Sequence, residues 1–233
     1  MISKVGIIGL GVIGASLGMA LRNSHSAIRV AGRDLDEETV QQAMEVGAID
    51  EMLDEQRLGE CDLVIIATPL SIIPQVIDEI KDKLRHGAIV SDVGSVKGLV
   101  MQILARNLPA DVYIIGGHPM AGSEKSGLSA ADKFLFQNAA YILTPHSHVP
   151  AEIADEMQQF ISAIGARVMV MDAQEHDQVV ARVSHLPHLM STALVNNLLD
   201  KPGAISLAGG GLRDTTRTAA SDPALWEDIL SLN

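Results

Sequence analysis

The stretch Lys4-Val-Gly-Ile-Ile-Gly-Leu-Gly-Val-Ile-Gly14 decides the fold of this chain. Its apolar run, residues 5–8, predicts a buried parallel strand, which turns at Gly9 and leads into a helix that opens at Gly14. The glycines follow the spacing G-x-G-x-x-G, in which Gly9 allows the tight turn, Gly11 lets a diphosphate approach the backbone and Gly14 lets helix pack against strand. Free amides at the start of that helix would hold the diphosphate, so the stretch predicts a dinucleotide-binding site.

The second expected strand, residues 28–32, ends at Arg33-Asp34 and bears on the choice of coenzyme. Asp34 lies 20 residues after Gly14, where a carboxylate can accept hydrogen bonds from the hydroxyls of the adenosine ribose. That carboxylate would repel the 2′-phosphate of NADP, whereas Arg33 could pair with it. We therefore expect NAD and keep NADP as a possibility. In the alternative interpretation Asp34 and Asp36 only cap the next helix, for which Asp36 is the better placed.

Further apolar strands are expected at residues 63–68, 88–92, 112–115, 140–143 and 167–171, with helices between them. This alternation predicts a Rossmann-like α/β fold with a doubly wound, mostly parallel sheet. Ligands of such sheets bind outside the carboxyl ends of the strands, where Thr68, Ser95 and His118 fall. The residues expected to bind the coenzyme are Gly9, Leu10, Gly11, Val12, Ile13, Gly14, Arg33, Asp34, Thr68, Pro69 and Ser95.

Composition narrows the class of protein. The chain has 233 residues, of which 47% are hydrophobic, and a net charge of −12, which argues against nucleic acid and anionic membranes as partners. Its one cysteine, Cys61, permits no internal disulfide and is compatible with a reducing compartment. No charged-then-apolar leader precedes the first strand and no apolar run is as long as a membrane span. We expect a soluble cytoplasmic protein.

The pattern changes at Asp172, where we place a domain boundary. Residues 1–172 form the expected dinucleotide-binding domain, and residues 173–233 the expected helical domain for substrate and dimerisation. One long helix is expected over residues 173–199, kinked where Pro187 removes a hydrogen bond to the carbonyl of Val183. Pro223 suits the first turn of a last helix.

Two polar residues at the strand ends are candidates for chemistry. His118 follows two glycines and could move protons near neutral pH, or it could be a structural histidine bonded to backbone. Ser95 could cap a helix, or it could hydrogen-bond a coenzyme amide or His118. A serine nucleophile is not favoured, because the chain has no G-x-S-x-G elbow around it.

The helical domain adds further histidines and arginines. His185 and His188 share a helix face, but their spacing is not H-E-x-x-H, so contacts to substrate or a buried structural role are favoured over a metal site. His176 with Asp177 is interpreted as a feature of the helix start. Two more cations, Arg213 and Arg217, could clamp a carboxylate or form surface ion pairs.

Six segments together resemble the prephenate and arogenate dehydrogenase family of tyrosine biosynthesis. They are Gly-Leu-Gly-Val-Ile-Gly14, Asp-Val-Gly-Ser-Val-Lys97, Gly-Gly-His-Pro-Met-Ala-Gly-Ser-Glu124, Val-Ser-His-Leu-Pro-His188, Gly-Gly-Gly-Leu-Arg-Asp-Thr-Thr-Arg217 and Ser-Asp-Pro-Ala-Leu-Trp226. The glycine fingerprint alone is unspecific, whereas the other five in this order are specific and extend over nearly the whole chain.

The resemblance implies oxidative decarboxylation of prephenate with NAD as hydride acceptor. It makes His118 the base on the ring hydroxyl and lets Ser95 orient His118 and the nicotinamide. Arg217 would bind a substrate carboxylate, His188 would lie near the side-chain end, and Glu124 would shape the site. The residues expected to bind substrate are His118, Glu124, His185, His188, Arg213 and Arg217. No metal is expected.

The resemblance also frames the alternatives. His188 favours prephenate over arogenate as substrate. An imine or hydroxy-acid reductase would need a catalytic lysine in the long helix, and none occurs between Ala173 and Asp200. Family members usually continue into more helices, so a shortened helical domain is expected, with a homodimer where those helices are present or supplied. A nucleotide-binding module that has lost catalysis is the third possibility.

Overall fold

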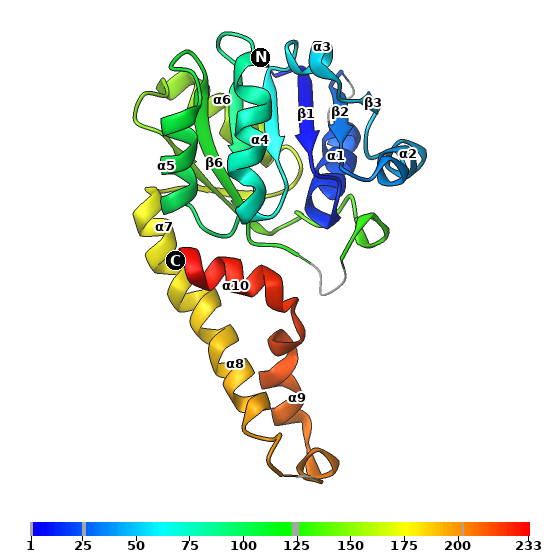
Figure 1. Cartoon of the computed structure of the whole chain (residues 1–233), viewed down its shortest axis with the longest axis vertical. Helices are drawn as coiled ribbons and strands as arrows, with labels where there is room; N and C mark the ends of the chain where they lie inside the picture. The colour runs from blue at the N-terminus through cyan, green and yellow to red at the C-terminus, as the bar shows by residue number, and fades with distance from the viewer. Residues whose placement is uncertain (1, 25–26, 123–125, 202) are drawn as a thin grey trace.

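The computed structural model describes residues 2–24, 27–122, 126–201 and 203–233. An α/β part contains the strands, and a helical part projects from it as a long arm (Figure 1). In Figure 1 the arm runs down through α7 and α8, returns through α9, and ends with α10 lying back under the α/β part. The last helix therefore lies close to the start of the arm.

Within the described residues the sheet has eight strands, in the order β3-β2-β1-β4-β5-β6-β7-β8. The strands are β1 (Lys4–Ile8), β2 (Arg29–Arg33), β3 (Glu51–Met52), β4 (Leu63–Ile66), β5 (Ile89–Asp92), β6 (Tyr113–Pro119), β7 (Ala140–Pro145) and β8 (Arg167–Val170). All neighbours pair parallel except β6 and β7, which pair antiparallel. The expected doubly wound, mostly parallel sheet is confirmed.

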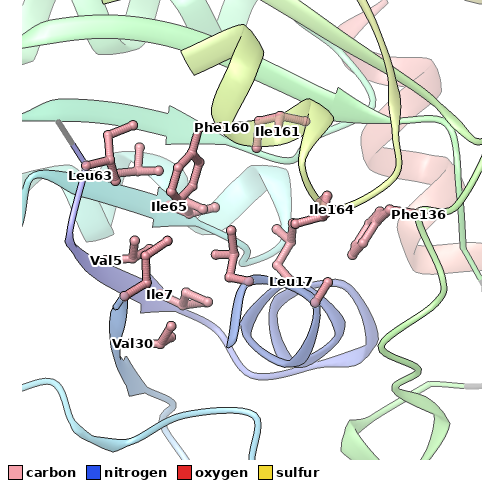
Figure 2. Packing of buried hydrophobic residues seen from close by; sticks show 14 of the residues in the cluster. Val5, Ile7, Leu17, Val30, Leu63, Ile65, Phe136, Phe160, Ile161 and Ile164 are labelled. Atoms are coloured by element: carbon pink, nitrogen blue, oxygen red, sulfur yellow. The ribbon is translucent and has the colours of Figure 1, made fainter. Parts of the chain in front are cut away.

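Helices cover both faces of this sheet. They are α1 (Val12–Ser24), α2 (Glu37–Glu45), α3 (Glu55–Leu58), α4 (Ile73–Ile80), α5 (Gly98–Asn107) and α6 (Ala151–Ser162), with 3₁₀ turns at Leu70–Ile72, Lys81–Lys83 and Leu128–Ala130. One face packs on α1 and α6, as Figure 2 shows for Ile7 and Ile65 beside Leu17 and Ile161. Alternate strand residues such as Val64 pack on the opposite face, against α4 and α5. Two apolar layers thus fix the strand ends in place.

The sequence prediction and the structure differ at three places in this part. The short strand β3 was not expected, because two residues are too few for a periodic pattern. The fifth predicted strand is longer than expected, so His118 lies inside β6 and not in a loop after it. The helix after β5 begins at Gly98 with Lys97 as its N-cap residue, so Ser95 does not cap it.

The helical part comprises α7 (Ala173–Val180), a π-helical turn η4 (Ala181–His185), α8 (Leu186–Asn196), η5 (Ala204–Leu207), α9 (Gly210–Thr216), η6 (Arg217–Ala220) and α10 (Pro223–Leu232). The predicted interruption of the long helix takes the form of the π turn, in which the Leu186 amide donates to the Ala181 carbonyl. It lies just before Pro187, which has no N–H to continue the ordinary ladder. The turn points His185 inward.

Asp228 of α10 ties the arm back to the α/β part. Its Oδ2 accepts a hydrogen bond of 2.8 Å from Ser71 Oγ, after β4. No helix of the described ranges combines the length and apolar content needed to cross a membrane.

Candidate active site

The turn from β1 into α1 is built around its glycines. Gly9 has φ of +95°, a conformation that side chains rarely adopt, and the space a Cβ would need there is filled by the Ala67 carbonyl at 2.6 Å. A Cβ on Gly14 would come within 2.0 Å of the Gly9 carbonyl oxygen, whereas one on Gly11 would meet nothing within 4 Å. Gly9 and Gly14 are therefore required by the fold, and Gly11 opens the loop to a ligand.

Asp34 supports this turn directly. Its Oδ2 accepts a hydrogen bond of 2.8 Å from the Leu10 amide, and its Oδ1 accepts one of 3.2 Å from the Asp36 amide. Asp36, in turn, accepts hydrogen bonds from two amides at the start of α2, so it is the N-cap that the sequence predicted. The neighbouring Arg33 pairs with Glu79 at 3.0 Å between Nη2 and Oε2. The carboxylate of Asp34 retains lone pairs for a further donor.

Thr68 and Pro69 follow β4 beside this turn, because the Ala67 amide donates to the Ile8 carbonyl. Thr68 Oγ1 is buried and makes no hydrogen bond to any residue that the structure describes. A buried hydroxyl without a partner costs free energy unless a ligand or water supplies one. Half-buried Ser95 lies on the turn between β5 and α5.

His118 is the centre of the site. Its Nδ1 lies 2.7 Å from His176 Nε2, and His176 Nδ1 lies 2.7 Å from Asp177 Oδ1. Asp177 also accepts hydrogen bonds of 2.7 and 2.8 Å from the amides of Lys97 and Gly98, at the start of α5. His118 and His176 are both buried, with 7% and 0% of their surface exposed. Two imidazoles and a carboxylate thus form one hydrogen-bonded chain.

A buried ion pair lies near His118. Lys97 Nζ contacts Asp92 Oδ2, and neither side chain is exposed. Asp92 also accepts hydrogen bonds from the amides of Gly94 and Gly117, the residue before His118. Burial lowers the pKa of Lys97, although its partner Asp92 opposes that shift.

The surroundings of His118 favour its neutral form. Burial, followed by the positive charge of Lys97, holds the pKa of His118 well below its usual value of 6.5. Burial also opposes ionisation of Asp177, but hydrogen bonds from His176 and from two backbone amides outweigh it and lower the pKa of that carboxyl. At neutral pH the site therefore presents an unprotonated imidazole supported by a carboxylate.

The second pair of histidines lies on the arm and packs on the single tryptophan. His188 is stacked on Trp226, with ring centroids 3.5 Å apart, and His185 meets the same ring edge-on at 5.9 Å. His188 Nδ1 lies 3.1 Å from the Thr218 carbonyl. Burial lowers the pKa of both histidines. Among the described residues, no group of three or more His, Cys, Asp or Glu side chains is arranged to hold a metal ion.

The arginines expected to bind substrate lie further along the arm. Arg213 is in the last turn of α9 and Arg217 begins η6, both with exposed side chains. Glu124, the remaining candidate, falls outside the described residues. By sheet topology the glycine turn, Thr68 and His118 lie along the same edge of the sheet, with β4 and β5 between β1 and β6. His185 and His188 are grouped on Trp226, and the two arginines lie on α9 and η6.

Two family models match the chain. The model described as "Prephenate dehydrogenase, nucleotide-binding domain" matches residues 17–170, and the one described as "Prephenate dehydrogenase, dimerization domain" matches residues 172–233. The chain belongs to the prephenate dehydrogenase family. The resemblance drawn from the six segments is thereby confirmed.

Known members of this family are similar along nearly the whole chain. A prephenate dehydrogenase of Bacillus subtilis is 38% identical over 232 residues, which are 97% of this chain but 62% of that protein, so this chain spans less than two thirds of it. The crystal structure of prephenate dehydrogenase from A. aeolicus, in complex with hydroxyphenyl propionate and NAD+, is 32% identical with a TM-score of 0.90, covering 99% of this chain and 82% of that one. A Synechocystis arogenate dehydrogenase structure is 32% identical with a TM-score of 0.84, covering 98% and 83%.

For this family member, the sequence interpretation missed two features of the site. It assigned His176 and Asp177 to the helix start, but Asp172 caps α7 and the dyad instead reaches His118 and α5. It also gave Lys97 no role of its own. The available signals were a His-Asp pair in the first turns of a polar helix and a lysine in an otherwise apolar turn.

Proposed function

We propose that this chain catalyses the NAD-dependent oxidative decarboxylation of prephenate to 4-hydroxyphenylpyruvate, a step of tyrosine biosynthesis. One observation carries the proposal: a buried His118, hydrogen-bonded to a second imidazole, lies at the carboxyl-end side of a sheet whose first turn is an open glycine loop. The similarity to the A. aeolicus enzyme, whose structure holds NAD+ and hydroxyphenyl propionate, supports the same reaction.

The residues present fit NAD. The loop is open at Gly11, the amides at the start of α1 face it, and Thr68 Oγ1 is a buried hydroxyl without a partner in the described chain. Asp34 keeps the loop in shape and offers its remaining lone pairs to a ribose. Arg33, already paired with Glu79, is less available for a 2′-phosphate, which favours NAD over NADP. The bound coenzyme would supply the hydride acceptor.

In this proposal His118 is the base. A neutral imidazole accepts the proton of the ring hydroxyl, and the electron pair left on oxygen helps to expel the hydride from the same carbon. Loss of the ring carboxylate as CO2 then makes the ring aromatic, and the protonated His118 can return its proton to the phenolate oxygen. Burial keeps His118 unprotonated and ready for this role at neutral pH.

The other candidates have supporting roles. Ser95 would orient the nicotinamide or His118, although no hydrogen bond joins Ser95 to His118 among the described residues. His188 and His185 would lie near the side-chain end of the substrate, and Arg217 would bind a carboxylate. We place Glu124 and Arg213 with the same substrate-binding set, on the resemblance alone.

Arogenate is the second candidate substrate, because the Synechocystis arogenate dehydrogenase is as identical to this chain as the A. aeolicus enzyme. Prephenate and arogenate differ only where a keto acid is replaced by an amino acid. Burial lowers the pKa of His188, although the hydrogen bond to the Thr218 carbonyl opposes that shift, and a neutral ring adds no positive charge to repel the ammonium group of arogenate. The assay below therefore includes both substrates.

The proposal extends to domains and assembly. We propose that residues 1–172 form the coenzyme domain and residues 173–233 a helical substrate and dimerisation domain, which the ranges of the two family models support. A homodimer through the arm is supported by its exposed apolar side chains, which include Val183, Leu186, Leu189, Met190, Leu194, Leu199, Ile205 and Leu207. A cytoplasmic location stays a prediction.

The first experiment is an assay of NADH or NADPH formation by absorbance, with prephenate and with arogenate, each combined with NAD and with NADP. A His118→Asn variant is measured beside His86→Asn, which changes an exposed histidine in the turn before β5. Turnover of prephenate with NAD that falls at least about 10²-fold in His118→Asn alone supports the proposal.

No turnover with any of the four combinations, in a chain that still binds NAD, would contradict the catalytic proposal and favour a nucleotide-binding module. Equal activity in His118→Asn and His86→Asn would remove His118 from the base role while leaving the reaction itself in place.

A further inference from the structure

The hydrogen bonds that link His118, His176 and Asp177 have a defined donor-to-acceptor direction. We propose that His176 and Asp177 are positioning residues that hold His118 in the tautomer with its lone pair on Nε2, so that this nitrogen takes the proton of the substrate hydroxyl. The inference rests on the proposed function for the identity of that hydroxyl, but the tautomer itself is a property of the free protein.

Asp177 sets the direction because a carboxylate can only accept hydrogen bonds. Its Oδ1 lies 2.7 Å from His176 Nδ1, so that nitrogen carries a proton and donates it. In the tautomer that donates from Nδ1, the lone pair of His176 is on Nε2, which lies 2.7 Å from His118 Nδ1. His118 Nδ1 must therefore be the donor, and the lone pair of His118 is on Nε2.

Asp177 is itself fixed in place. Its two oxygens accept the amide hydrogens of Lys97 and Gly98, which are unsatisfied donors at the start of α5 and lie 80 and 79 positions earlier in the chain. These bonds prevent the carboxylate from rotating away from His176, because rotation would break two charge-assisted hydrogen bonds. The amides at the start of α5 thus fix the position of Asp177 and, through it, of His176.

The same arrangement prepares His118 for the charge that it gains. When Nε2 takes the proton, the O–H bond of the substrate breaks, an N–H bond forms, and the hydride leaves the ring carbon for NAD+. The resulting imidazolium still donates from Nδ1 to His176, and His176 still donates to the negative Asp177. None of the three side chains has to rotate or reverse a hydrogen bond during the proton transfer, so the site is preorganised for it.

Other charged and titratable groups also face His118. Asp92 ends β5 and Lys97 is the N-cap residue of α5. His185 lies on η4, while His176 and Asp177 approach from α7. The Lys97 ammonium, compensated by Asp92, opposes protonation of His118. Asp177 is the carboxylate that the hydrogen-bonded chain connects to His118, so its removal has the specific effect predicted below.

The primary test is the tautomer of His118 in the full chain, read from imidazole nitrogen shifts by NMR near neutral pH. We expect His118 and His176 each to be protonated on Nδ1. Resonances showing His118 protonated on Nε2 would overturn the inference, whether or not the protein turns over prephenate. Assignment uses the loss of signals in His118→Asn and His176→Phe.

The kinetic test uses Asp177→Asn, His176→Phe and His176→Gln. Asparagine at 177 can donate to His176 and reverse both tautomers, while phenylalanine removes both hydrogen bonds and keeps a ring. We expect kcat to fall about 10²-fold in these two, with KM for prephenate and Kd for NAD within about threefold. Glutamine at 176, which can accept from His118, should recover part of the loss.

Asp172→Ala is the matched control. It removes the side-chain N-cap of the same helix, where the Asp172 carboxylate accepts from the amides of Gln174 and Glu175, and it keeps the backbone carbonyl that accepts from the His176 amide. If Asp172→Ala lowers kcat as much as Asp177→Asn, the dyad only stabilises α7 and the inference is overturned. If the unaltered chain turns over neither prephenate nor arogenate, the proposed function fails, and the NMR result decides the tautomer independently.

Discussion

His188 and Trp226 lie face to face, with ring centroids 3.5 Å apart and ring planes 3° apart. The two residues come from α8 and α10, so the stack joins the outgoing and the returning halves of the arm. Trp226 also packs against the apolar layer that contains Ile229 and the buried residues of α4 and α5. One aromatic contact therefore links the candidate substrate residue His188 to the position of the last helix.

Replacing Trp226 with leucine should loosen α10 without unfolding the sheet. Loss of the stack and of part of the buried ring surface predicts a decrease of about 2 kcal/mol in the free energy of unfolding, measured with urea. Glu227→Ala, on an exposed position of the same helix, is the control and should change stability by less than about 0.5 kcal/mol. Similar values for the two variants would show that the stack contributes little.

Alanine at two glycines of the first turn should separate folding from binding. Gly14→Ala places a methyl group 2.0 Å from the Gly9 carbonyl oxygen and should cost about 3 kcal/mol or more of stability. Gly11→Ala meets no atom within 4 Å and should leave the melting temperature unchanged, yet raise Kd for NAD about tenfold, about 1.4 kcal/mol. Unchanged NAD binding by Gly11→Ala in calorimetry would contradict a diphosphate at this loop.

Much of the α/β part could be predicted from local sequence. Apolar runs and the spacing of three glycines are short-range signals, and the structure has strands at all seven of the runs. The strand β3 was not predicted, because its two residues pair only once β2 is in place. The extension of β6 through His118 depends on antiparallel pairing with β7, which no signal within β6 itself indicates.

The connection of His118 to Asp177 could not be predicted in the same way. His118 and His176 are 58 residues apart in the sequence, whereas His176 and Asp177 are adjacent. The three residues meet only because α7 packs against α5. The capping of α5 shows the same limit: Ser95 has the right residue type and lies nearby, but the helix start is satisfied by a carboxylate from α7. In both cases a tertiary contact, and not the local sequence preference, determines the structure.

The buried pair of Lys97 and Asp92 should be strongly coupled. Lys97→Met leaves Asp92 buried without its cation and should cost about 3–5 kcal/mol in urea unfolding. Asp92→Asn should also destabilise, because Asp92 accepts from two backbone amides. The double variant should lose less than the sum of the two, with a coupling of about 1–3 kcal/mol. Additive losses would mean that the two charges do not interact.

The neutral state of His118 predicts a pH dependence of stability. In the unfolded chain a histidine has a pKa of about 6.5, whereas burial and Lys97 hold the pKa of His118 well below that in the fold. As pH falls below about 6.5, the unfolded state takes up a proton at residue 118 that the folded state does not. The stability that neutral His118 contributes is therefore present at pH 8 and decreases toward pH 5.5 by about 1.4 kcal/mol. The stability advantage of the unaltered chain over His118→Asn, from thermal unfolding, should shrink by that amount. The other histidines are common to the chains and cancel, so an equal or larger advantage at pH 5.5 would show that His118 is already charged in the fold.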